Sequence, residues 1–243
     1  QLSAPDYRPD WEAVAAAITP RTRMIMINTP HNPTATIWTR ADLDRLAALT
    51  RGTGIIVVAD EVYEHIVFDG ASHASCAAHP ELAARSFVVS SFGKTYHITG
   101  WKVGYVLAPR ELMAEFRKVH QFNVFTVNTP VQLALADYMA DAGRHTGLAA
   151  FYQAKRNYFR AALANSRFDL LPAHGTYFQL ARYERISALG DTAFCEHLTR
   201  KVGVAAIPVS AFFADGRDER VIRFCFAKNE TTLAAACERL NAI

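Results

Sequence analysis

The sequence predicts an α/β protein in which a mainly parallel sheet flanked by helices is followed by a smaller α+β domain. Apolar runs of strand length occur at 23–28, 55–59 and 86–90, and a helical pattern separates the first two. This alternation is typical of right-handed crossovers between parallel strands. After residue 146, shorter strands and helices mix without that rhythm. We therefore predict a large domain over residues 1–145 and a small α+β domain over residues 146–243.

The elements of the predicted large domain follow from apolar periodicity and from end signals. The run at 23–28 is near-continuous, so we expect a strand covered on both faces. Thr39 supplies an N-cap for the next helix, and the Thr129-Pro130 pair suits the N-cap and first position of a later one. The expected elements are helix 9–19, strand 23–28, a turn at 29–34, a helix opened by Thr39 and ended at Gly52, strands 55–59, 86–90 and 103–108, and helices 111–121 and 129–139.

The predicted small domain begins with a long helix. Its expected elements are helix 147–165, strands 168–172 and 175–180, helix 192–201, strands 204–208 and 220–226, and a closing helix at 230–240. Side chains alternate between the two faces of a strand. In strand 220–226 this alternation places Arg223 on the face of Val221 and Cys225, opposite a more apolar face.

Composition excludes several classes of protein. The formal net charge is +3 and no block of lysine or arginine occurs, so we expect neither nucleic acid nor a membrane as partner. The four cysteines contain no C-x-x-C pair and the histidines no metal-ligand spacing. We expect no metal site, and reduced thiols in a cytoplasmic protein. The chain begins with Gln1 rather than Met, which suggests a processed or partial chain.

Polar clusters follow three of the predicted strands where each strand ends. They are Asn28 to Asn32, Asp60 to Tyr63, and Ser90 to Lys94. In mainly parallel sheets, ligands bind beyond the carboxyl ends of the strands. The sequence therefore predicts that these clusters converge on one edge of one sheet.

Lys94 is the centre of the third cluster. Ser91 and Gly93 precede it and Thr95 follows it, and such small residues let a bulky ligand approach the backbone. A desolvated lysine in this setting can act as an amine nucleophile toward a carbonyl. Lys102 is a second cation eight residues further on. The alternative is that Lys94 is an ordinary solvated loop lysine.

Four other residues each have two interpretations. Asp60 is either a helix N-cap or a buried carboxylate that awaits a cation. Tyr63 is a core tyrosine or a phenol directed at the same site, and Asn32 is a turn residue or a ligand. Arg223, among apolar neighbours, requires a carboxylate, which belongs either to the protein or to a substrate.

Together these residues resemble the class I/II aminotransferases, the fold-type-I pyridoxal-phosphate enzymes. In detail, Thr29 to Pro33 and Ser91 to His97 look most like bacterial methionine aminotransferases and the related kynurenine/glutamine aminotransferases. The matching motifs are Asn32-Pro33-Thr34, Asp60-Glu61-Val62-Tyr63, Ser91-Phe92-Gly93-Lys94, Gly100-Trp101-Lys102-Val103-Gly104 and Arg223-Phe224-Cys225.

The resemblance implies a role for each matched residue. Lys94 would form a Schiff base with pyridoxal 5′-phosphate and later move the proton between the substrate Cα and the cofactor C4′. Asp60 would pair with the pyridinium nitrogen, and a protonated ring accepts the electrons released from Cα. Asn32 and Tyr63 would hydrogen-bond the cofactor 3′-oxygen. Of these, Lys94, Asp60 and Tyr63 would be catalytic.

The resemblance also assigns residues to the two anionic groups, the cofactor phosphate and the substrate α-carboxylate. Ser91 and Lys102 would bind the cofactor phosphate, with Lys102 standing where many relatives have arginine. Arg223 would clamp the substrate α-carboxylate, and Asn32 is assigned to substrate binding as well. Ala35 departs from the family pattern, which has glycine at that position.

The resemblance further implies substrates and partners. We expect transfer of the amino group of a neutral, apolar or aromatic L-amino acid, such as methionine, phenylalanine or kynurenine, to a 2-oxo acid. Family members are homodimers, so a homodimer is expected. The family has a long amino-terminal part before the first residue of this sequence, so we expect a carboxy-terminal portion of an aminotransferase.

Two alternatives remain open. The same lysine and aspartate would also serve a cysteine-conjugate β-lyase that uses the same cofactor. The other alternative is an inactive fragment or a cofactor-sensing domain of a regulator, although no basic helix-turn-helix segment is visible in the sequence.

Overall fold

The computed structural model describes residues 2–243, which fall into two compact units. The amino-terminal unit comprises Trp11–Pro30 and Ile37–Ala149. The carboxy-terminal unit comprises Ala150–Ile243 together with His31–Thr36 and the residues up to Asp10. The short segment His31–Thr36 therefore belongs to a unit built mainly from the far end of the chain.

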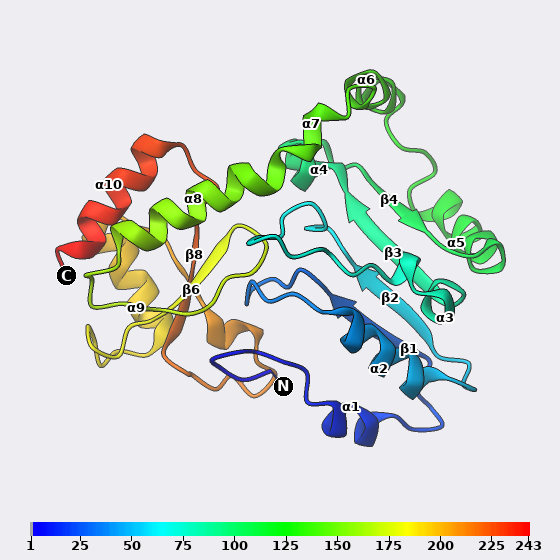
Figure 1. The fold of residues 1–243 in the computed structure, drawn as a ribbon, viewed down its shortest axis with the longest axis horizontal. Helices are drawn as coiled ribbons and strands as arrows, with labels where there is room; N and C mark the ends of the chain where they lie inside the picture. Colours follow the sequence, from blue (N-terminus) through cyan, green and yellow to red (C-terminus); the bar gives the residue numbers. More distant parts are fainter. Residues whose placement is uncertain (1) are drawn as a thin grey trace. The chain divides into compact units, whose positions relative to one another are not determined.

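The amino-terminal unit contains one four-stranded sheet with helices on its faces (Figure 1). The strand order follows the sequence, β1-β2-β3-β4. Its elements are α1 (Trp11–Ala17), β1 (Met24–Asn28), α2 (Arg40–Thr50), β2 (Ile56–Asp60), η1 (Cys76–Ala78), α3 (Pro80–Ala83), β3 (Ser86–Ser91), α4 (Phe92–Thr95), η2 (Thr99–Trp101), β4 (Gly104–Leu107), α5 (Arg110–Asn123), α6 (Thr129–Met139) and α7 (Gly143–Thr146).

The predicted mixed α/β architecture with a largely parallel sheet is confirmed. β1 pairs with β2 and β2 with β3 in parallel, whereas β4 runs antiparallel to β3. The antiparallel return needs only a short connection, which α4 and η2 supply. Gly104 lies opposite Ser91, and a Cβ at Gly104 would lie 2.5 Å from the Ser90 carbonyl oxygen, so this close pairing requires glycine.

One face of the sheet packs against α2, η1 and α3. Ile27, Val57 and Val88 contribute from the strands, and Leu43 and Leu46 from α2. Thr39 caps α2 as predicted: its hydroxyl oxygen accepts from the Asp42 N–H, while the Asp42 carboxylate accepts from the Thr39 N–H at 2.7 Å. This reciprocal capping box fixes where α2 begins.

β1 differs from its prediction. Met24 and Met26 are 51% and 72% exposed, so among the described residues β1 is covered on one face rather than on both. Its apolar run does not alternate with polar residues, and sequence alone could not distinguish the two situations. On the other face of the sheet, α5 lies against β3 through Phe116 and Phe87, whose ring centroids are 6.1 Å apart.

The carboxy-terminal unit contains a second sheet of antiparallel strands in the order β5-β6-β8-β7. Tyr7, Leu171, Leu180, Val209 and Val221 form a buried cluster in this unit. Its elements are α8 (Leu148–Ala162), which enters the unit at Ala150, β5 (Asp169–Leu170), β6 (Phe178–Arg182), α9 (Asp191–His197), the π-helical turn η3 (Leu198–Val202), β7 (Ile207–Pro208), η4 (Val209–Phe212), β8 (Val221–Cys225) and α10 (Glu230–Asn241).

Element types match the predictions better than their ends do. The second strand expected at 175–180 lies at 178–182, and the helix expected at 192–201 changes to a π-helical turn after His197. The N-cap predicted at Thr129 is wrong: Asn128 caps α6, and its side chain accepts from the Val131 N–H at 3.2 Å. Both residue types can cap, and asparagine one position earlier leaves Thr129 and Pro130 as the first two helical residues. None of the helices in residues 2–243 is long and apolar enough to cross a membrane.

We predict that Thr39→Ala lowers the free energy of unfolding by about 1 kcal/mol, because it removes the hydroxyl that accepts from the Asp42 N–H and donates to the Asp42 carboxylate. The measurement is the midpoint of urea unfolding followed by circular dichroism. Thr231→Ala is the matched control, since Thr231 is exposed near the start of α10 and does not cap it. Equal losses in the two variants would contradict the capping role.

Candidate functional site

The parallel strands of the amino-terminal sheet end side by side. Asn28 ends β1, Asp60 ends β2 and Ser91 ends β3. Asn28 lies opposite Asp60 in the register, and its side-chain nitrogen donates to the Asp60 carbonyl oxygen at 2.9 Å. Parallel register thus brings the polar groups that follow these strands to one edge of the sheet.

Asp60 is a half-buried carboxylate at this edge. Its Oδ1 accepts from the Val62 N–H at 3.2 Å, and a turn rather than a helix follows it, so it is not a helix N-cap. Burial raises the pKa of Asp60, while the Val62 N–H and the charge of Lys94 act in the opposite direction. A carboxylate disfavoured by burial is stabilised by a nearby cation. The group is therefore suited to pair with a positive charge.

Lys94 lies in the short helix α4, immediately after β3. The Ser91 hydroxyl caps this turn by accepting from the Gly93 N–H at 3.1 Å, and it donates to the Val103 carbonyl oxygen at 3.3 Å. A Cβ at Gly93 would lie 2.9 Å from the Thr99 Cα, so the backbone of the following loop approaches α4 as closely as glycine allows. Lys94 is thus held on a closely packed turn and is itself half-buried.

Lys102 occupies a different setting from Lys94. It ends η2 with φ 55°, a left-handed conformation that is uncommon for a residue other than glycine, and its side chain is exposed. Val103, the next residue, is buried. The cation therefore lies on the surface of the loop that packs against α4.

Glu64 is a residue that the sequence analysis missed. Its Oε1 accepts hydrogen bonds from the Ser90 hydroxyl at 2.7 Å and from the Tyr105 hydroxyl at 2.5 Å. These bonds join the turn that carries Asp60 and Tyr63 to the end of β3 and to β4. Burial, followed by the bond to Glu64, raises the pKa of Tyr105 to about 12. Glu64 follows a motif residue directly, but its two partners come from later strands, so no local pattern predicts them.

A second carboxylate supports the same turn. Glu61 is fully buried, and it accepts from the Cys76 N–H at 2.9 Å and contacts His73 Nε2 at 2.8 Å. Tyr63, two residues later, is 3% exposed. The segment Asp60–Glu64 is therefore fixed on both sides, as a site with defined geometry requires.

Asn32 and Arg223, the other two predicted site residues, both lie in the carboxy-terminal unit. An Arg223 Nη1–H donates to Asn32 Oδ1. The Arg223 guanidinium also lies over the Phe178 ring, with its Cζ 4.1 Å from the ring centroid. These two residues, far apart in the sequence, form one contact pair.

The turn that carries Asn32 is held by unusual backbone contacts. Ala35 has φ 59°, in the left-handed region that glycine adopts without strain. Its carbonyl oxygen accepts from the His174 N–H at 2.8 Å and the Gly175 N–H at 3.0 Å. These bonds help hold Ala35 in a conformation that alanine alone disfavours.

A cavity of about 330 Å³ adjoins Asn32 within the same unit. Leu2, Tyr7, Val209, Phe212 and Phe213 give it apolar walls, and His31, Pro33 and Thr34 complete it. His31 Nδ1 contacts the Thr34 hydroxyl at 2.7 Å, and burial lowers the pKa of His31 to about 4. The imidazole is therefore neutral near pH 7, and none of the described residues lining this cavity is an acid, a lysine or an arginine.

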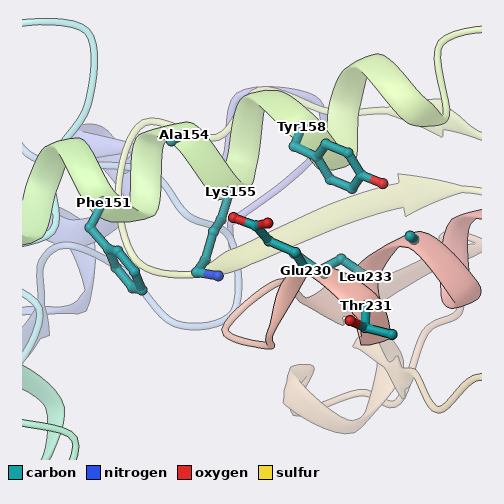
Figure 2. Close-up of a pocket in the computed structure, with 8 residues that line it drawn as sticks. Phe151, Ala154, Lys155, Tyr158, Glu230, Thr231 and Leu233 are labelled. Carbon is teal, nitrogen blue, oxygen red and sulfur yellow. The ribbon is translucent and has the colours of Figure 1, made fainter.

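A second cavity, of about 570 Å³, lies between α8 and α10 (Figure 2). Phe151, Lys155 and Tyr158 face it from α8, and Glu230 and Leu233 from α10. Lys155 donates to the Lys228 carbonyl oxygen at 2.7 Å. None of the predicted site residues lines this cavity, so its larger volume does not make it the candidate active site. In the described part of the chain, no group of three or more histidine, cysteine or acidic residues could hold a metal ion.

The fold and the strand-end residues define a class of protein that comparison with known families identifies. The pattern of the family described as "Aminotransferase class I and II" matches residues 2–240. The chain belongs to this family.

The relatives are enzymes of several names. The chain is 52% identical over all 243 residues to the methionine aminotransferase of Escherichia coli K12, and it spans 63% of that protein. It is 36% identical to a probable N-succinyldiaminopimelate aminotransferase of Mycobacterium tuberculosis, with 96% of this chain and 62% of the relative covered. The kynurenine–oxoglutarate transaminase 1 of Rattus norvegicus is 31% identical, with 97% and 61% covered. The chain thus spans less than two thirds of these relatives.

Solved structures of aminotransferases also superpose closely on this chain. The structure of YbdL from E. coli, described as having a methionine aminotransferase function, superposes with a TM-score of 0.97 at 52% identity and covers all of this chain, which spans 64% of that one. The N-succinyldiaminopimelate aminotransferase of M. tuberculosis gives 0.91 at 37% identity, with 99% and 63% covered.

Class I/II aminotransferases use pyridoxal 5′-phosphate. One feature of the amino-terminal unit fits this cofactor. Burial disfavours the charged form of the Asp60 carboxylate, and a cationic ring nitrogen beside it would stabilise that charge. Lys94 supplies an amine close enough for its charge to act on Asp60. The residues present are compatible with the cofactor of the family.

We predict that acid destabilises the chain partly through His31. An unfolded histidine has a pKa of about 6.5, so between that pH and about 4 the unfolded chain binds a proton that folded His31 does not. Stability therefore falls as the pH falls through this window, with a slope of up to about 1.4 kcal/mol per pH unit from this residue.

The measurement is the free energy of unfolding from urea curves between pH 7 and pH 4.5. His31→Gln should reduce the slope, whereas His174→Gln, at an exposed position, should leave it unchanged. An unchanged slope in His31→Gln would show that other groups govern acid sensitivity.

Proposed function

We propose that this chain carries the cofactor-binding and carboxylate-binding residues of a pyridoxal-phosphate-dependent aminotransferase. The reaction moves the amino group of a neutral, apolar or aromatic L-amino acid to a 2-oxo acid. The observation that carries the proposal is Lys94 on a packed turn beside a half-buried Asp60, at adjacent strand ends of a class I/II aminotransferase. The relatives named for methionine and kynurenine support the substrate class.

Each residue has a defined task. Bound pyridoxal phosphate supplies the electron sink that allows the substrate Cα–H bond to break. Lys94 Nζ would hold the cofactor covalently and would carry the proton removed from the substrate Cα. Asp60 would keep a proton on the ring nitrogen by offering it a negative charge. Asn32 and Tyr63 would donate to the cofactor 3′-oxygen, and Ser91 and Lys102 would bind its phosphate.

The substrate is held by its α-carboxylate. Arg223 is half-buried and its guanidinium can offer two parallel N–H groups to a carboxylate. Asn32, which accepts a bond from Arg223, orients it and contacts the same substrate. The neutral, largely apolar cavity beside Asn32 supports an uncharged substrate side chain, because an unpaired carboxylate there would lose its hydration.

The proposal extends to organisation and location. The boundary near residue 146 between the two proposed domains, 1–145 and 146–243, is supported by the compact unit that includes Ala150–Ile243, whereas the residues up to Asp10 and His31–Thr36 group with that unit rather than with the rest of residues 1–145. A homodimer is supported by Phe122 and Phe125, 87% and 82% exposed near the end of α5, since large apolar side chains this exposed commonly mark interfaces. A cytoplasmic location is supported by four free cysteines.

We predict that Lys94→Ala lowers the rate of transfer from L-methionine to a 2-oxo acid by at least about 100-fold, because it removes the group that moves the Cα proton. The measurements are product formation and the visible spectrum of added pyridoxal phosphate. Lys118→Ala, which removes an exposed lysine paired with Glu115, should retain both activity and spectrum. If the wild-type spectrum equals that of free cofactor and no transfer occurs, the 243-residue chain is not an enzyme by itself.

We predict that kcat/KM for L-methionine exceeds that for L-glutamate by at least about 100-fold, since burying an unpaired carboxylate costs several kcal/mol. Steady-state rates with a common 2-oxo acid acceptor measure the ratio. Comparable values for the two donors would contradict a neutral side-chain site. Pyruvate and ammonia released from a cysteine conjugate without an oxo acid would instead indicate β-elimination.

A further inference from the structure

Arg223 is held by aromatic rings within the carboxy-terminal sheet. In the register of β6 and β8, Leu180 lies opposite Arg223 and Phe178 lies opposite Cys225. Phe178 and Arg223 are therefore diagonal neighbours on one face of two antiparallel strands, within reach of long side chains. The Arg223 Cζ lies 4.1 Å from the Phe178 ring centroid and 5.6 Å from that of Phe212.

The two rings differ in how firmly they are placed. Phe178 is 6% exposed and its ring packs against Tyr177, with centroids 4.8 Å apart, whereas Phe212 is 46% exposed. Phe178 therefore offers a fixed surface to the guanidinium. The hydrogen bond from Arg223 Nη1 to Asn32 Oδ1 constrains the group at a second point, from a segment distant in sequence.

Neither the Phe178 ring nor the Asn32 amide carries a negative charge that would neutralise the guanidinium. A carboxylate in the place of Phe178 would pair with Arg223 and compete with any substrate carboxylate. The face of an aromatic ring attracts the cation but accepts no strong hydrogen bond, so the Phe178 ring itself occupies none of the N–H groups at the edge of the guanidinium. A long arginine side chain that is already ordered also loses less conformational freedom when a ligand binds.

We propose that Phe178 is a positioning residue for carboxylate binding: its ring fixes the plane of the Arg223 guanidinium so that the edge receives the substrate α-carboxylate. The inference rests on the proposed function, in which Arg223 clamps that group. Phe178 itself touches Arg223 rather than the reacting atoms, and it acts through Arg223.

The test compares Phe178→Leu with Phe224→Leu. Phe224 is the neighbour of Arg223 in β8, is 3% exposed, and packs against Phe159 and Phe168 with centroids 5.7 Å and 5.6 Å away. Both changes remove a buried ring, but only the first removes the ring beneath Arg223. Phe178→Tyr restores a ring at the position.

We expect Phe178→Leu to raise KM for the amino acid about 3- to 30-fold with kcat within about twofold, because the α-carboxylate contact is present in both ground and transition states. Phe224→Leu should lower the melting temperature while leaving KM unchanged, and Phe178→Tyr should recover most of the wild-type KM. Equal effects of the two leucine variants on KM, or no effect of Phe178→Leu, would overturn the inference.

Two measurements keep the test independent of activity. The first is the dissociation constant of 3-phenylpropanoate, a carboxylate without an amino group, which should weaken by the same factor in Phe178→Leu alone. The second is the Arg223 Hε resonance of the wild-type chain, which a ring at this distance should shift upfield; an ordinary position contradicts the stacking even if a variant does not fold. Absent transamination with selective 3-phenylpropanoate binding would refute the proposed function and leave the role of Phe178 intact. Transamination with equal 3-phenylpropanoate binding in wild type and Phe178→Leu would refute the role alone.

Discussion

Parallel pairing of β1, β2 and β3 is the constraint on which the candidate site of the amino-terminal unit depends. Because Asn28 lies opposite Asp60 and Asp60 opposite Val89, the polar groups after each strand reach the same edge. A slip of one residue would turn each side chain to the other face. The buried residues Ile27, Val57 and Val88 fix this register by packing against α2 and its neighbours. The apolar core thereby determines where the carboxylate of Asp60 and the amine of Lys94 lie.

Close backbone approach and buried carboxylates then make this edge rigid. Gly93 and Gly104 allow the segments after β3 to approach within distances that a side chain would forbid. Glu61 and Glu64 each accept two hydrogen bonds and thereby join the turn after β2 to neighbouring segments. A buried carboxylate is tolerated only when its oxygens have such partners. The oxygens of Glu61 and Glu64 already have these partners. Asp60, whose pKa is raised mainly by burial, is therefore the carboxylate of this turn that is suited to a cationic ligand.

In the carboxy-terminal unit, the charged group of the candidate site is Arg223, and its surroundings differ from those of the buried carboxylates. Arg223 lies among apolar residues of β8, and it contacts the Phe178 ring and the Asn32 amide. Neither of these two contacts carries a negative charge. The neutral state of His31 and the apolar walls beside Asn32 give the surroundings the same character. Under the proposed function, this combination would suit a substrate that has one carboxylate and an otherwise uncharged side chain.

The sequence alone determined the fold class, the types of most elements and the family. Uninterrupted apolar runs and capping signals such as Thr39 are local features, and the motifs around Asn32, Asp60, Lys94 and Arg223 are short and ordered. The ends of β6 and α9 and the cap of α6 were less predictable, because neighbouring residues compete for the same role.

Only the tertiary structure decided which distant residues meet. The partners of Glu64 are Ser90 and Tyr105, and that of Arg223 is Asn32, so these contacts cross long stretches of sequence. The exposed face of β1 and the ring beneath Arg223 likewise follow from packing and register. Hydrogen bonds and burial between distant segments depend on the register of strands, and no local pattern of residues encodes that register.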